Sequence, residues 1–157
     1  MPMIGKSTAV RSEETAMKTM HMVVSVVLLL SAAVGAYILA TDAYLWSTAP
    51  THAYGLGAFT VIDLALIAGL WKMPRIAIPG ALLLGLIQLG AMSGDLFFGT
   101  MTFSSDVTTA AAFSKYLLGD SAFVTLLGIQ AALIVAGIAA FAIRRGTLSA
   151  TREVAGE

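Results

Sequence analysis

Hydrophobic and polar positions alternate along the chain in long blocks. Four long apolar runs are separated by short polar stretches, and a helix over each run at 1.5 Å per residue would cross about 30 Å of hydrocarbon. The pattern therefore predicts an all-α integral membrane protein, a single four-span bundle that takes in residues 1–157. The expected spans cover about 20–41, 52–72, 76–95 and 121–144.

Polar residues near the ends of these runs suggest where helices begin. Ser12, followed by two glutamates, and Thr51, preceded by a proline, both fit the N-cap position. Pro79 is expected in the first turn of the third span, where a missing N–H costs little. The stretch "SSDVTTAAAFSKYLLGDS" has cap candidates of its own and predicts a short extra-membrane helix between the third and fourth spans.

Composition agrees with a membrane protein and narrows its chemistry. Hydrophobic residues make up 58% of the chain, charged residues 11%, and the mean hydropathy is +0.88, whereas soluble domains are roughly half apolar and a quarter charged. The net charge of zero gives no field that would attract nucleic acid. The absence of cysteine excludes disulfides, thiolate metal sites and thioether haem attachment.

The basic residues predict an orientation. Eight of the nine lie before the first span, in the turn between the second and third spans, or after the fourth span, and Lys115 alone lies on the other side. By the positive-inside rule, the chain is a multi-pass protein of the cell membrane with both termini in the cytoplasm. The eight are Lys6, Arg11, Lys18, Lys72, Arg75, Arg144, Arg145 and Arg152.

One acid interrupts the second span. Asp63 lies about 14 to 17 Å from either end of this span by helical rise, near the membrane midplane. A carboxyl there costs at least a few kcal/mol, so it should face the bundle and have a partner. Gln130 is expected at nearly the same depth, Gln88 about two turns nearer the outside, and Thr60 one turn away on the same helix.

Three interpretations of Asp63 remain open from the sequence. Its carboxyl group could share hydrogen bonds with a neighbouring helix and fix the helix register, because polar groups in membranes often join helices. It could instead belong to a proton or cation pathway, because intramembrane acids mark such pathways. The third interpretation is that it meets a polar group on another subunit.

Small residues recur at every fourth position on three of the predicted helices. This spacing lets helices approach closely, either within the bundle or against another subunit. The positions are Ser31 and Gly35 on the first helix, Gly90 and Gly94 on the third, and Gly128, Ala132, Ala136 and Ala140 on the fourth.

The stretch "MKTMHM" is the one candidate metal site. Met17, Met20 and His21 share a helix face, and thioether and imidazole groups suit Cu(I), but ordinary packing by methionine explains the same pattern. His52, the only other histidine, is expected at the opposite membrane edge from His21, which excludes a haem bound by both histidines within this chain. We therefore expect no metal or cofactor in the chain itself.

The long loop between the third and fourth spans is a candidate docking surface. Its aromatic and aliphatic residues are too apolar for a solvated tail, and Phe113, Tyr116 and Leu117 would present an apolar surface to a partner protein. Lys115 is the single basic residue of this loop, against Asp106 and Asp120, and this charge pattern favours a protein partner over anionic lipid.

The stretch "PTHAYGLGAFTVIDLALIAGLWKMP" resembles small multi-span accessory subunits of archaeal membrane energy complexes, of the ammonia monooxygenase or terminal oxidase type. It covers about a sixth of the chain and contains no diagnostic catalytic residue. The resemblance implies a companion role, with any metal or haem on partner subunits. We therefore expect a non-catalytic subunit of a hetero-oligomeric membrane complex, surrounded by lipid and other integral membrane subunits. The alternative is a homo-oligomeric channel or a proton or cation carrier that uses Asp63.

Overall fold

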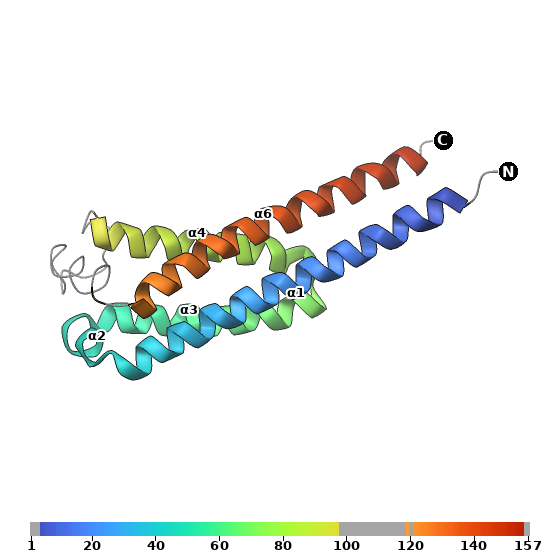
Figure 1. Cartoon of the computed structure of the whole chain (residues 1–157). Helices are drawn as coiled ribbons and strands as arrows, with labels where there is room; N and C mark the ends of the chain where they lie inside the picture. Colours follow the sequence, from blue (N-terminus) through green and yellow to red (C-terminus); the bar gives the residue numbers. More distant parts are fainter. Residues whose placement is uncertain (1–3, 98–118, 120, 156–157) are drawn as a thin grey trace.

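The computed structural model describes residues 4–97, 119 and 121–155, and these form helices, of which α1 to α4 follow one another with single residues between them. The long helices run side by side, with both termini at one end of the bundle and α2 at the other (Figure 1). We refer to these as the terminal end and the α2 end. The helices are α1 (Ile4–Thr41), α2 (Ala43–Thr48), α3 (Pro50–Lys72), α4 (Pro74–Phe97) and α6 (Ser121–Ala155).

Four of these helices are long and apolar enough to cross a membrane, which confirms the predicted all-α four-helix membrane bundle. α1 and α6 continue beyond their apolar segments and project from the bundle at the terminal end (Figure 1). The extra-membrane helix predicted before the fourth span lies outside the described residues. The membrane-spanning segments are Thr15–Thr41, Pro50–Lys72, Pro74–Gly94 and Ser121–Arg144.

Two of the predicted helix starts are wrong. α1 begins at Ile4 and runs through Ser12 without a break, because the residues before Ser12 are compatible with helix and nothing stops the helix there. α3 begins at Pro50 with Ala49 as its N-cap, so Thr51 already lies inside the helix. Proline fits the first helical position because its φ is preset and its missing N–H is not needed there.

The short helix α2 closes the connection between α1 and α3. The Asp42 carboxylate accepts a hydrogen bond from the Leu45 backbone N–H at 3.1 Å and so caps α2. The Trp46 indole donates to the Leu39 carbonyl at 2.7 Å and packs edge-on against the Tyr54 ring, with 5.6 Å between ring centroids. These contacts hold the α2 end of α1 against α3.

Pro79 was predicted in the first turn of its helix, but this prediction is wrong, because α4 begins at Pro74 and Pro79 lies inside it. A proline inside a helix cannot donate to the carbonyl four residues earlier, which here belongs to Arg75. The Arg144 guanidinium of α6 donates to this same carbonyl, with 3.2 Å between Nη1 and O. A side chain from α6 thus supplies the donor that Pro79 lacks and joins α6 to the start of α4.

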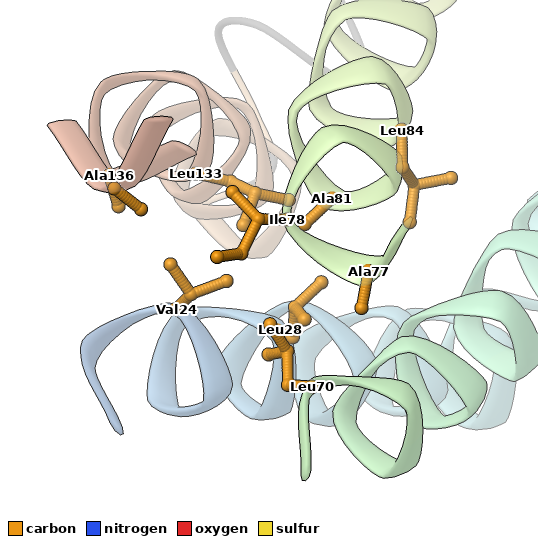
Figure 2. Packing of buried hydrophobic residues seen from close by; sticks show 10 residues of the cluster. Val24, Leu28, Leu70, Ala77, Ile78, Ala81, Leu84, Leu133 and Ala136 are labelled. Carbon is orange, nitrogen blue, oxygen red and sulfur yellow. The ribbon is translucent and has the colours of Figure 1, made fainter. Parts of the chain in front are cut away.

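Two apolar clusters form the buried core. The terminal-side cluster brings together buried side chains from all four long helices, which point toward one another in Figure 2. Its buried members are Val24, Leu28, Leu70, Ala77, Ile78, Ala81, Leu84, Leu133, Ala136 and Ala140.

The second cluster, the α2-side cluster, lies toward the other end of the bundle. Its buried members come from α1, α2, α3 and α6 and the residue between α2 and α3, and Met92 of α4 packs against them. The buried members are Ile38, Leu45, Ala49, Ala53 and Leu126.

Close helix approaches occur at two glycines in particular. A Cβ at Gly35 of α1 would lie 2.7 Å from the Thr60 Oγ1 of α3. A Cβ at Gly137 of α6 would lie 3.0 Å from the Leu82 Cβ and 3.3 Å from its Cα on α4. A Cβ at Gly35 would require the Thr60 hydroxyl to move, and a Cβ at Gly137 would lie closer to Leu82 than most Cβ contacts do, so glycine favours the close approach of the α1–α3 and α4–α6 pairs at these positions.

Candidate functional site: a buried polar layer

One buried polar side chain from each spanning helix lies between the two apolar clusters. Ser31 of α1, Asp63 of α3, Gln88 of α4 and Gln130 of α6 are 2%, 1%, 1% and 0% exposed. In α1, α4 and α6, the polar residue separates residues of the terminal-side cluster from residues of the α2-side cluster, and in α3 Asp63 lies between the buried Ala53 of one cluster and the buried Leu70 of the other. We call these four residues the polar layer.

Ser31 is the centre of the hydrogen bonds in this layer. Its hydroxyl donates to Oδ2 of Asp63 at 2.6 Å and accepts from Nε2 of Gln130 at 2.8 Å. One serine on α1 therefore links α3 and α6. Because a hydroxyl has one hydrogen to donate and lone pairs to accept with, both bonds can form at once.

Gln88 brings α4 to the same place. Its side chain approaches the Asp63 carboxyl group, but its Nε2 is not in hydrogen-bonding geometry with any described protein atom. Oδ1 of Asp63 and Oε1 of Gln130 likewise have no hydrogen-bond partner among the described atoms. The layer thus contains two hydrogen bonds to the Ser31 hydroxyl, and three polar atoms without a partner among the described atoms.

The sequence had identified most of this layer but not its connections. Gln130 does reach Asp63, although through Ser31, which the sequence had suggested only as a small packing residue. Gln88 belongs to the layer and does not lie two turns nearer the outside, as predicted. The predicted depth was counted along the helix from the nearest acid. This count is unreliable because the ends of different helices lie at different depths in the membrane. The Thr60 hydroxyl donates to the Leu56 carbonyl of its own helix at 2.9 Å and is not bonded to Asp63.

A feature of the composition could have identified both glutamines. The chain has no asparagine and only two glutamines, Gln88 and Gln130, and both are in the polar layer. In membrane helices, a carboxamide is costly unless it is hydrogen-bonded. Two isolated glutamines in apolar runs therefore indicate buried partners more strongly than helical depth does.

The predicted small-residue faces divide into buried and open positions. Ser31, Gly35, Gly94, Ala136 and Ala140 are buried inside the bundle. Gly90, Gly128 and Ala132 are exposed, and a Cβ at either glycine would meet nothing within 4 Å.

The candidate metal ligands lie in α1, near the terminal end of its membrane-spanning segment Thr15–Thr41. Met17 and Met20 pack against the terminal-side cluster. The imidazole Nε2 of His21 is buried and has no hydrogen-bond partner among the described atoms. Within the described residues, no three His, Asp or Glu side chains are grouped so that they could hold a metal ion. The predicted docking residues Phe113, Tyr116 and Leu117 lie outside the part of the chain that the structure describes.

No protein-family model, curated protein or solved structure matches the chain. The fold and the site themselves define its class: a multi-pass α-helical membrane protein whose four spans meet at a buried polar layer. Chemically, the layer can do two things. It can join helices through hydrogen bonds, and its carboxyl group can hold or release a proton.

Proposed function

We propose that this chain is a non-catalytic structural subunit of a larger hetero-oligomeric complex in the cell membrane, with both termini in the cytoplasm. The observation that carries the proposal is the setting of Asp63. It is the only Asp or Glu within the four spans, and it is hydrogen-bonded to another helix with an apolar cluster on either side. This arrangement suits joining helices and gives little support to a polar route along the bundle.

The outer surface of the bundle supports a subunit role. Large apolar side chains on the spans are exposed, among them Val61, Leu83 and Val135, so lipid or other helices must cover them. Gly90 and Gly128 are open small-residue positions, at which an added Cβ would meet no atom of the described residues within 4 Å. Small exposed residues of this kind allow a helix of another subunit to approach closely.

The type of complex is suggested by the resemblance of residues 50–74 to accessory subunits of archaeal membrane energy complexes. A respiratory or monooxygenase complex is therefore our first choice. In such a complex, the metal or haem would belong to partner subunits, and this chain would position them in the membrane.

The proposal is tested by purifying the full-length tagged chain from its native membrane in mild detergent. Mass spectrometry and absorption spectra would then identify the chains and cofactors that accompany it. We expect a constant set of other integral membrane proteins. Recovery of the chain only as a monomer or with copies of itself would contradict the proposal.

Matched glycine variants test where the partners bind. Gly90→Leu and Gly128→Leu should lower the recovery of partner chains several-fold, because a large side chain keeps another helix away. Gly55→Leu is the control: a Cβ there also meets nothing within 4 Å, but the position lies at the α2 end of α3. Its recovery of partners should match that of the wild type.

A homo-oligomeric channel or a proton or cation carrier is the second candidate. The observation in its favour is that three buried atoms have no hydrogen-bond partner among the described residues: Oδ1 of Asp63 and, nearer the terminal end of α1, the Ser25 hydroxyl and the His21 Nε2. Against it, Val24 and Leu28, which lie among these residues on α1, are fully buried in the terminal-side cluster. This candidate predicts a flux that depends on a titratable group at position 63.

A further inference from the structure

Three unpartnered atoms in the polar layer require an explanation. They are Oδ1 of Asp63, Nε2 of Gln88 and Oε1 of Gln130, and each belongs to a residue that is at most 1% exposed. An unsatisfied buried polar group is unfavourable, and at this depth neither lipid headgroups nor bulk water can satisfy it. Native structures have few such groups, so three in one layer indicate a shared ligand.

The direction of the existing bonds fixes what Gln130 presents. The single hydroxyl hydrogen of Ser31 is donated to Asp63, so Ser31 can only accept from Gln130, and the Gln130 amide must present its Nε2 to that oxygen. Its Oε1 is therefore left as an acceptor. Gln88 approaches a carboxyl group whose Oδ1 is unpartnered, which favours the donor side of its amide facing the layer.

With Oδ1 of Asp63 also an acceptor, the ligand offers two donors and one acceptor. One water molecule has this combination: its two hydrogens can be donated to Asp63 Oδ1 and Gln130 Oε1, and its oxygen can accept from Gln88 Nε2. Buried waters typically make about three hydrogen bonds to otherwise unsatisfied groups. A metal cation fits less well, because the Gln88 N–H group would point its positive end at it.

We infer that the polar layer binds one ordered water molecule that bridges Asp63, Gln88 and Gln130. The direct hydrogen bonds connect α1, α3 and α6, whereas Gln88 of α4 approaches Asp63 without good hydrogen-bonding geometry to it and would be joined to the others through this water. The water thus completes a link among all four spans. The inference concerns the interior of the chain and does not depend on the proposed function.

The composition of the chain allows a direct test by NMR. Because the chain has two glutamines and no asparagine, labelling glutamine side-chain amides with ¹⁵N in the full-length protein in detergent gives one NH₂ signal for each of the two glutamines of the layer. Gln88→Leu assigns the two signals. In a rotating-frame Overhauser spectrum, we expect a cross-peak between water and the side-chain amide protons of Gln88. Its sign should be that of a dipolar contact, which indicates a long-lived bound water.

Two variants define the site. Gln130→Leu removes one of the two acceptors, so the cross-peak at Gln88 should fall at least several-fold. Thr60→Val is the matched control, because this hydroxyl lies one turn from Asp63 but is bonded only to its own helix. The cross-peak should persist in that variant.

The wild-type spectrum alone can overturn the inference, even if a variant does not fold. The inference fails if Gln88 shows no cross-peak to water, or only a cross-peak with the sign of chemical exchange, which indicates access of bulk solvent. It also fails if replacing choline chloride by sodium chloride shifts both amide signals in a saturable way, since the ligand is then a cation.

Discussion

The Ser31 hydroxyl donates a hydrogen bond of 2.6 Å to Oδ2 of Asp63, across the contact between α1 and α3. Both residues are almost completely buried, and the same hydroxyl accepts a bond from Gln130 of α6. The only acid within the spans is thus held by a serine that apolar sequence surrounds. Removing either partner leaves a buried polar group unpaired and should therefore lower the stability of the bundle.

Ser31→Ala should destabilise the bundle, because Asp63 Oδ2 and Gln130 Nε2 both lose their partner. Hydrogen bonds between membrane helices are worth about 0.6 kcal/mol on average and up to about 1.7, so we expect a loss of roughly 1–3 kcal/mol from the two bonds together. Reversible unfolding in detergent measures the free energy. Ser25→Ala is the matched control on the same helix, because this buried hydroxyl has no partner among the described atoms. Equal losses in the two variants would contradict the role of Ser31.

Gly137→Ala should be destabilising by about 1–3 kcal/mol, the usual cost of overpacking. The added Cβ would lie 3.3 Å from the Leu82 Cα, which belongs to the backbone of α4 and cannot rotate away. Gly128→Ala, on the same helix, meets nothing within 4 Å and should leave the free energy of unfolding unchanged or raise it slightly. The paired unfolding measurements fail to support the α4–α6 contact if Gly137→Ala is as stable as Gly128→Ala.

A double-mutant cycle tests the pairing of Pro79 with Arg144. Arg144→Met should lower stability by roughly 0.5–1.5 kcal/mol, because the Arg75 carbonyl loses its donor. In a Pro79→Ala background, the backbone N–H of residue 79 can bond this carbonyl, so the same substitution should cost less. The expected coupling is about 0.5 kcal/mol or more. Strictly additive effects would show that Arg144 does not replace the missing donor.

Cysteine labelling tests the proposed orientation. Because the chain has no native cysteine, only the introduced cysteine can react. Met73→Cys, in the α3–α4 connection, should resist an impermeant thiol reagent added to intact cells and react after the cells are opened. Ser47→Cys, on the exposed side of α2, should react in intact cells. Both positions are solvent- or lipid-facing in the fold, so the contrast reports sidedness. Strong labelling of position 73 from outside would show that the orientation is opposite to the proposed one.

The spans could be predicted from the sequence because apolar runs of membrane length leave few other options. Their ends could not be predicted as well: Ser12 lies inside α1 and Thr51 inside α3, because a suitable cap residue does not stop a helix that can continue. The small helix α2 was not predicted, because its six residues, Ala43–Thr48, are too few to show a helical pattern in the sequence.

The site could be predicted in part. Asp63 was identified because an acid within an apolar run is costly and needs a partner. Gln130 was identified as that partner because its predicted depth in the membrane is close to that of Asp63. Ser31 was missed as its partner because serine is also a common small packing residue, and only the rotation of α1 about its axis decides which role it has. That rotation depends on contacts such as Gly35 against Thr60, which a single sequence does not reveal.

The central claim is that Asp63 joins helices and does not carry protons or cations. Proton and sodium flux into liposomes that contain the purified protein tests this claim most directly, with Asp63→Asn and Asp63→Leu measured beside the wild type. Asn keeps the hydrogen-bonding capacity that Leu lacks. The account predicts flux no greater than in protein-free liposomes for all three, with wild-type folding of Asp63→Asn and reduced stability of Asp63→Leu. A wild-type flux that disappears in a normally folded Asp63→Asn variant would contradict it.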